Sequence, residues 1–185
     1  MNNAKILTHL LNNKTEEFTI NQIAKATGLN YRIAHTQVKL LEEDNLIQTK
    51  RIGNSLLCSL THKFDEKIFR AEFERQNQLP KKILRIKDRF EKANQSYILL
   101  LFGSYAKRTN TKGSDIDLLA ITENKEEIEE ITDLIPENIH LTGITYAEFI
   151  KMNMSKELSV VSEAVKHNIV LLGIEEYYRL LQNAL

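Results

Sequence analysis

The chain has 185 residues, which is enough for one or two domains. Hydrophobic residues make up 42% of it and charged residues 27%, a composition that excludes disordered and collagen-like chains. Its longest apolar run, residues 97–102, is far shorter than the roughly 20 residues of a membrane-spanning helix, and residues 1–5 carry no apolar signal core. The single cysteine, Cys58, excludes an internal disulfide. We therefore expect a cytoplasmic protein without a membrane contact.

The 25 basic and 25 acidic residues balance overall but are unevenly spread. Residues 1–62 carry a net charge of +2, residues 63–94 of +4 and residues 95–185 of −6. Phosphate backbones would be attracted to the first part and repelled by most of the last. This uneven distribution suggests that the two parts of the chain have different functions. The alternative is a chance distribution of solvated charges.

Short helices and strands alternate in the first sixty residues. Apolar residues recur at helical spacing over residues 2–13, 21–27 and 31–44, whereas residues 18–20 favour a strand. We expect Asn21 to cap the second helix and Gly28 to end it, since glycine tolerates a positive φ. Residues 46–51 and 55–60 are strand candidates around a hairpin turn. Two short helices joined through a glycine turn are typical of a helix-turn-helix.

The third predicted helix has an apolar face and an opposite polar face at 100° per residue. In a helix-turn-helix the second helix of the motif enters the major groove, and a hairpin tip reaches phosphates easily. We expect contacts to double-stranded DNA from five residues of this helix and the hairpin: Arg32, Thr36, Lys39, Lys50 and Arg51.

The string Asn-Gln-Ile-Ala-Lys-Ala-Thr-Gly-Leu at residues 21–29 is typical of the winged helix-turn-helix domains of prokaryotic regulators. The resemblance covers residues 1–62 and implies DNA binding. Such domains also serve as dimerisation or protein-docking modules, which is the alternative interpretation here.

Two amphipathic helices are expected over residues 64–79 and 81–93, separated at Pro80. Their apolar stripes favour a linker that also helps the chain to form a homodimer, because pairing suits two-fold DNA sites. Packing within one chain is the alternative.

The chemistry is concentrated between residues 97 and 122. A buried strand ends at Gly103-Ser104, and a second apolar strand begins at Asp115-Ile116-Asp117. A Gly-Ser turn lets backbone and hydroxyl donors approach phosphate oxygens. Because residues i and i+2 of a strand share a face, Asp115 and Asp117 project together, where a magnesium ion would relieve their repulsion. Together these groups would hold a metal-bound nucleoside triphosphate.

The string Phe-Gly-Ser-Tyr-Ala at residues 102–106, followed by Ser-Asp-Ile-Asp-Leu-Leu at residues 114–119, resembles the minimal nucleotidyltransferases of the DNA polymerase β superfamily. The resemblance covers residues 95–173. It implies that Gly103 and Ser104 bind the triphosphate, ATP in our expectation, and that Asp115 and Asp117 are the catalytic ligands of Mg²⁺ or Mn²⁺. The predicted fold class is therefore α/β (α+β): a winged helix-turn-helix at 1–62, a helical linker at 63–94, and a polymerase-β-like nucleotidyltransferase domain with a small mixed sheet at 95–185.

The sequence departs from the family in two places. Family members often have glycine where this chain has Arg108, so we expect the turn there to differ. They also often carry a third carboxylate on a later strand, but the equivalent residues 138–145 contain no Asp or Glu. Glu148 follows in what reads as a capping box, and His140 is the remaining candidate near the metals.

Three functions are consistent with these features. The first is a nucleotidyltransferase that acts as an antitoxin, modifies a tyrosine of an all-helical partner toxin and represses its own operon. The second is a DNA-binding regulator whose transferase fold has become a nucleotide sensor. The third is an adaptor that uses neither site, against which the two aspartates argue.

Overall fold

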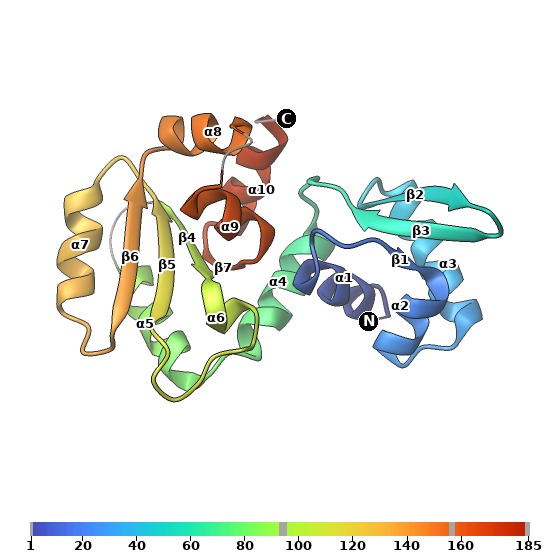
Figure 1. The fold of residues 1–185 in the computed structure, drawn as a ribbon, viewed down its shortest axis with the longest axis horizontal. Helices are drawn as coiled ribbons and strands as arrows, with labels where there is room; N and C mark the ends of the chain where they lie inside the picture. Colours follow the sequence, from blue (N-terminus) through green and yellow to red (C-terminus); the bar gives the residue numbers. More distant parts are fainter. Residues whose placement is uncertain (1, 93–95, 156–157, 184–185) are drawn as a thin grey trace. The chain divides into compact units, whose positions relative to one another are not determined.

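The computed structural model describes residues 2–92, 96–155 and 158–183. It divides into two compact units, Met1–Glu74 and Arg75–Leu185. Each unit combines helices with one small sheet (Figure 1). The mixed α and β character is as predicted, and the domain boundaries drawn after residues 62 and 94 stay predictions.

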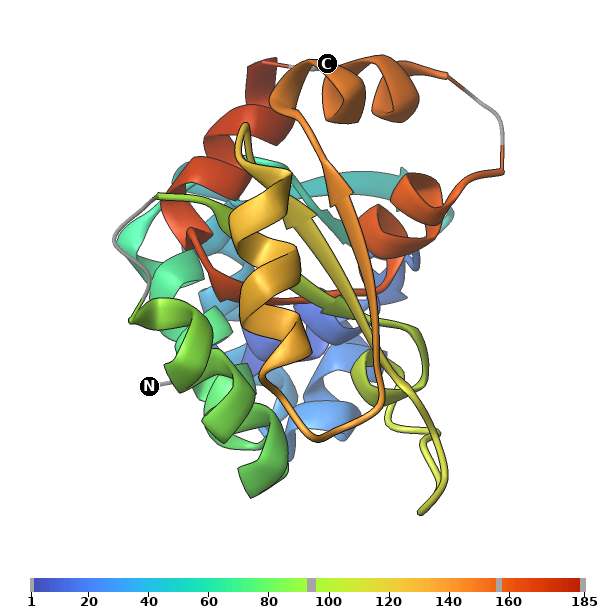
Figure 2. The same ribbon diagram turned by 90° about the vertical axis from the view of Figure 1, so that its left-hand side faces the viewer.

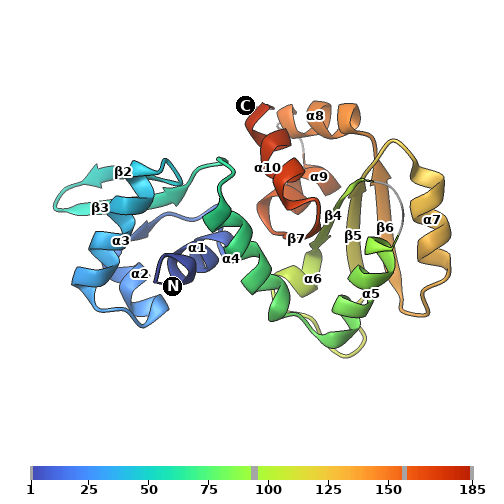
Figure 3. The same cartoon turned by 180° about the vertical axis from the view of Figure 1, so that it is seen from behind.

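The first unit holds three helices and a three-stranded antiparallel sheet of order β1-β3-β2 (Figure 3). Apolar residues at helical spacing, such as Leu7, Leu10 and Val38, are almost fully buried where the helices pack together. Its elements are α1 (Asn2–Asn12), β1 (Phe18–Thr19), α2 (Ile20–Thr27), α3 (Tyr31–Glu43), β2 (Ile47–Ile52) and β3 (Ser55–Leu60), followed by α4 (Glu66–Asn77), which crosses the division.

Side-chain bonds fix where α2 begins, and a glycine fixes where it ends. The expectation that Asn21 caps α2 was wrong: the cap is Thr19, whose hydroxyl accepts from the Gln22 N–H while the Gln22 side chain accepts from the Thr19 N–H. This reciprocal pair satisfies two free donors at once, which a lone Asn21 cannot do. Gly28 ends α2 with φ 68°, as predicted.

The second unit is built on a mixed four-stranded sheet of order β6-β5-β4-β7. Strands β4 and β5 are antiparallel, as are β4 and β7, whereas β5 and β6 run parallel. Its remaining elements are α5 (Lys81–Glu91), β4 (Ile98–Phe102), α6 (Gly103–Ala106), β5 (Ile116–Ile121), α7 (Lys125–Asp133), β6 (Ile139–Ile144), α8 (Tyr146–Met154), α9 (Val160–Lys166), β7 (Ile169–Leu172) and α10 (Ile174–Asn183).

Each face of this sheet has its own cover. Alternate strand residues, including Leu99, Leu101 and Leu118, form one buried core with α5 and α7, which lie side by side over that face (Figure 2). The strand residues between them belong to the other face, where α9 and α10 contact β4. Burial on both faces explains the continuous apolar run of β4.

The free edge of β7 is closed by side chains from the end of α4. Arg75 Nη2 donates to the Asn168 carbonyl over 2.6 Å, and Gln76 Nε2 donates to the Val170 carbonyl over 2.5 Å. Both side chains are almost fully buried. Since unpaired edge carbonyls invite pairing with another chain, this arrangement protects the sheet.

Serines stand at the facing ends of α8 and α9. Ser155 ends α8, and α9 starts after Ser159, whose hydroxyl accepts from the Ser162 N–H over 3.1 Å. Residue 93, the last of the predicted helix over residues 81–93, lies outside the described residues. Among the described helices, none has the length and apolar character needed to cross a membrane.

Candidate nucleotide and metal site

The turn from β4 into α6 brings Gly103 directly against the Asp117 carboxylate. Phe102 and Asp117 are register partners across β4 and β5. Gly103 has φ 65°, and a Cβ there would lie 2.0 Å from Asp117 Oδ2. Only glycine meets both conditions, the left-handed backbone and the space for the carboxylate. Gly103 and the Asp117 carboxylate therefore lie directly against each other.

The two aspartates differ in their surroundings. Asp117 lies in β5 with its side chain 26% exposed, and its neighbour Ile116 is buried in the core. Asp115 comes before β5, which begins at Ile116 rather than at Asp115 as expected. Its exposed carboxylate accepts from Asn138 Nδ2 over 2.5 Å. Asp117 is thus held by the sheet, and Asp115 by a neighbour at the start of β6.

Asn138 was given no role in the sequence analysis. It directly precedes β6, and its backbone carbonyl also accepts from the Ile116 N–H over 3.0 Å. A polar residue at the start of a strand parallel to the one that carries the aspartates is the signal that could have identified it.

His140 occupies the place beside Asp117 on the neighbouring strand. The two residues are register partners in the parallel β5 and β6 pair. His140 Nδ1 lies 3.6 Å from Asp117 Oδ1, and the His140 side chain is 71% exposed. No residue of β6 is an acid, as the sequence shows.

Glu148 is committed elsewhere, as the capping box predicted. Its carboxylate accepts from Lys125 Nζ over 2.8 Å and from the Thr145 N–H over 2.7 Å. The bonds from Lys125 and Thr145 lower the pKa of Glu148 to about 2. It therefore stays ionised and bound at the start of α8, and does not serve as the third acid.

The loop between α6 and β5 has a left-handed backbone at Arg108, a residue other than glycine. Arg108 has φ 58°, and its guanidinium donates to Gln78 Oε1 over 2.5 Å. Arg108 thus adopts the backbone that glycine favours, and the expected difference from the family's turn stays a prediction. The preceding Lys107 instead pairs with Glu163 of α9 over 2.7 Å.

A divalent cation fits the donors at this place. The space that a Cβ would fill at Gly103 is taken by one oxygen of Asp117, and Asp115 lies two residues earlier, just before β5. Carboxylates and phosphate oxygens are the ligands that Mg²⁺ prefers. Among the described residues, no three His, Cys, Asp or Glu side chains are grouped as a metal site.

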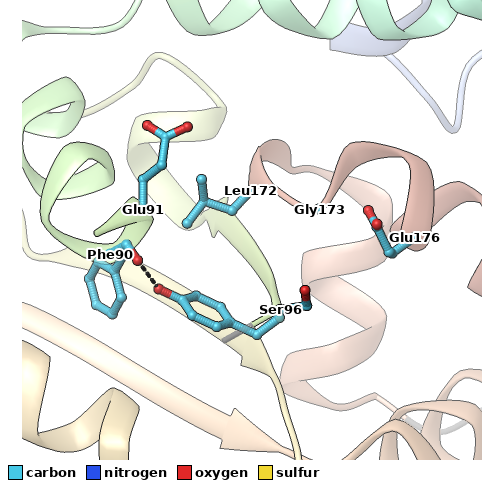
Figure 4. A pocket seen from close by; sticks show the side chains of 7 residues that line it. Phe90, Glu91, Ser96, Leu172, Gly173 and Glu176 are labelled. Atoms are coloured by element: carbon cyan, nitrogen blue, oxygen red, sulfur yellow. Dashed lines mark hydrogen bonds between the residues drawn. The ribbon is translucent and has the colours of Figure 1, made fainter. Parts of the chain in front are cut away.

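A separate hollow lies at the opposite end of β4, beside Tyr97 (Figure 4). Its lining includes Glu91, Ser96 and Glu176, and the Tyr97 hydroxyl donates to the Phe90 carbonyl. Desolvation raises the pKa of Tyr97, which keeps that hydroxyl protonated. None of the predicted site residues lines this hollow.

The five residues predicted to contact DNA are all exposed in the first unit. A groove between α3 and the β2–β3 hairpin brings Lys39 and Arg51 together along its lining. Arg32, Thr36 and Lys50 are not part of that lining, and the Thr36 hydroxyl donates to the Arg32 carbonyl over 3.0 Å.

A glycine turn, a strand-borne aspartate against it and a second aspartate two residues away define the class of site found in enzymes that handle nucleoside triphosphates with a divalent metal. Comparison with protein families agrees. The family model described as "Polymerase beta, Nucleotidyltransferase" matches residues 84–177, just over half of the 185 residues. The chain belongs to this nucleotidyltransferase family. Neither curated proteins nor solved structures give a match.

Proposed function

We propose that the protein transfers a nucleoside monophosphate from ATP to a hydroxyl group. The observation that carries this proposal is that the Asp117 carboxylate occupies the space where a residue other than glycine at position 103 would have its Cβ. Asp115 and Asp117 would hold Mg²⁺ or Mn²⁺, and Gly103 and Ser104 would bind the triphosphate. When bound, the cation would neutralise charge on the departing pyrophosphate. The acceptor hydroxyl gives its proton to solvent, its oxygen bonds to the α-phosphorus, and the bond from the α-phosphorus to the bridging oxygen breaks, so that pyrophosphate leaves.

The test is transfer of label from α-labelled ATP in the presence of Mg²⁺. We expect label on an acceptor protein or on the chain itself, and its loss in Asp115→Asn and in Asp117→Asn. Asp133→Asn, in α7, is the matched control because Asp133 is not among the site residues. Equal labelling by the wild type and the double aspartate variant would contradict the proposal.

The proposed acceptor is a tyrosine of an all-helical toxin. In this proposal the protein is an antitoxin and acts in the cytoplasm. Support comes from the Gly-Ser and Asp-Ile-Asp motifs, which resemble those of small stand-alone transferases. A neighbouring gene for a small helical protein would supply the acceptor for the labelling test, and absence of label on its tyrosines would contradict this assignment.

The first unit is proposed to be a winged helix-turn-helix that binds double-stranded DNA and represses the protein's own operon. Support comes from the glycine turn between α2 and α3, and from the exposed basic side chains on α3 and the hairpin. We expect a gel shift on the operon's promoter that weakens as salt rises, because binding releases counterions. Arg32→Ala/Lys39→Ala should abolish it, whereas Lys151→Ala/Lys166→Ala removes the same charge from α8 and α9 and should not. A shift that persists in the first variant would contradict DNA reading by α3.

A homodimer is proposed for the DNA-bound form. Phe69 and Phe73 lie one turn apart on α4 and are 45% and 51% exposed, which leaves an apolar stripe for a second copy. Sedimentation analysis should show a dimer that Phe69→Ser/Phe73→Ser converts to a monomer, and an unchanged sedimentation coefficient would contradict it.

The absence of an acid in β6 favours a second candidate, a regulator whose transferase unit senses a nucleotide. Titration calorimetry with the non-transferable analogue α,β-methylene-ATP measures binding, and α-labelled ATP measures transfer, so the two experiments together separate the candidates. Binding without transfer to any acceptor supports the sensor.

A further inference from the structure

The strand next to the aspartates presents a nitrogen ligand where an acid would be expected. Parallel pairing of β5 and β6 places His140 beside Asp117. One carboxylate oxygen of Asp117 faces Gly103, while the other lies 3.6 Å from His140 Nδ1. This separation is too long for a hydrogen bond, so the two atoms are near each other without being bonded.

Two ligand atoms that share an octahedral cation at bond lengths of about 2.1 Å lie about 3 Å apart. A small rotation of His140 closes the difference, because its side chain is 71% exposed and little packing opposes the movement. The nearest glutamate after β6 is no competitor, since Lys125 and Thr145 hold Glu148.

We infer that His140 is a ligand of the divalent cation held by Asp117, and that the site therefore prefers Mn²⁺ to Mg²⁺. The inference rests on the proposed nucleotidyl transfer and specifies its metal. Mg²⁺ favours carboxylate, phosphate and water oxygens, whereas the first-row transition ions also bind imidazole nitrogen, Mn²⁺ the most weakly of that series. Replacing a carboxylate by an imidazole in the ligand set thus shifts selectivity toward Mn²⁺.

The test measures metal binding by the full chain in the presence of α,β-methylene-ATP. Free Mn²⁺ is followed by its electron paramagnetic resonance signal, and Mg²⁺ by competition. We expect His140→Ala to bind Mn²⁺ at least about tenfold more weakly while Mg²⁺ binding changes less. His140→Asp should reverse the preference in favour of Mg²⁺. His35→Ala removes a histidine from the other unit and is the matched control.

A second readout is the NMR signal of the His140 ring, assigned by its loss in His140→Ala. Substoichiometric Mn²⁺ should broaden this signal in the wild type but not in Asp117→Asn. If Asp117→Asn abolishes Mn²⁺ binding while His140→Ala leaves both affinities unchanged, the His140 assignment is overturned and the transferase proposal stands. If the wild type binds neither ion, both fail.

Discussion

At the scale of single residues, Gly103 shows how one missing side chain creates a site. The backbone there is left-handed, and the space of its Cβ is filled by the Asp117 carboxylate. Gly113 lies in the following loop with nothing within 4 Å of its Cβ position. The two glycines therefore differ in what they permit: Gly103 makes room for a carboxylate, and Gly113 makes room for no neighbouring group.

We predict that Gly103→Ala costs about 1–2 kcal/mol of unfolding free energy, because alanine must adopt a left-handed backbone and displace the carboxylate. Mn²⁺ and nucleotide binding should be lost as well. Gly113→Ala should leave both unchanged. Chemical denaturation and calorimetry measure the two effects, and a fully active Gly103→Ala would contradict the geometry.

At the scale of elements, the ends of helices depend on pairs of residues. In α2, Thr19 and Gln22 bond reciprocally, whereas Asn21 is an exposed residue of the first turn. Propensity alone favoured Asn21 because asparagine is a good cap, but the position of the chain in β1 decides which residue has the extended backbone that a cap requires.

Thr19→Ala should therefore lower the unfolding free energy by about 1 kcal/mol. Asn21→Ala should change it by less than about 0.5 kcal/mol, as expected for an exposed substitution away from a cap. Thermal unfolding followed by circular dichroism separates the two, and the opposite order would restore Asn21 as the cap.

The edge of β7 gives a second prediction at this scale. Gln76→Met keeps the volume of the side chain but leaves the Val170 and Leu171 carbonyls without this donor. We expect a loss of about 1–3 kcal/mol and faster aggregation, because buried carbonyls and an open edge are both costly. Gln182→Met, at an exposed position of α10, is the control. Denaturant titration and light scattering provide the measurements, and equal behaviour of the two variants would contradict edge protection.

At the scale of the whole molecule, the two compact units are each nearly neutral, whereas the segments predicted from the sequence differ in net charge. Residues 1–74 contain 10 basic and 9 acidic residues, and residues 75–185 contain 15 and 16. The contrast between +6 for residues 1–94 and −6 for the rest fades because α5, rich in lysine and arginine, packs within the second unit. Any attraction to DNA must therefore come from local groups on α3 and the hairpin rather than from net charge.

Ligand binding should raise the stability of the full chain through the second unit. Mn²⁺ with α,β-methylene-ATP at about 100 times its dissociation constant should add about 2.7 kcal/mol. The increase should vanish in Asp117→Asn and persist in Arg32→Ala/Lys39→Ala, because the altered residues belong to different units. Scanning calorimetry tests this, and stabilisation of the Asp117 variant would place the nucleotide elsewhere.

The sequence by itself determined the order and type of most elements, because apolar periodicity and glycine turns are local signals. It also determined the Gly103, Asp115 and Asp117 motif, whose spacing is written along one segment. Tertiary structure alone decided that Asp117 fills the space beside Gly103, that Asn138 bonds to Asp115, that His140 lies beside Asp117, and that Arg75 and Gln76 close the edge of β7. These contacts join residues 14 to 94 positions apart, and no local pattern specifies such pairs because strand register and helix packing set them.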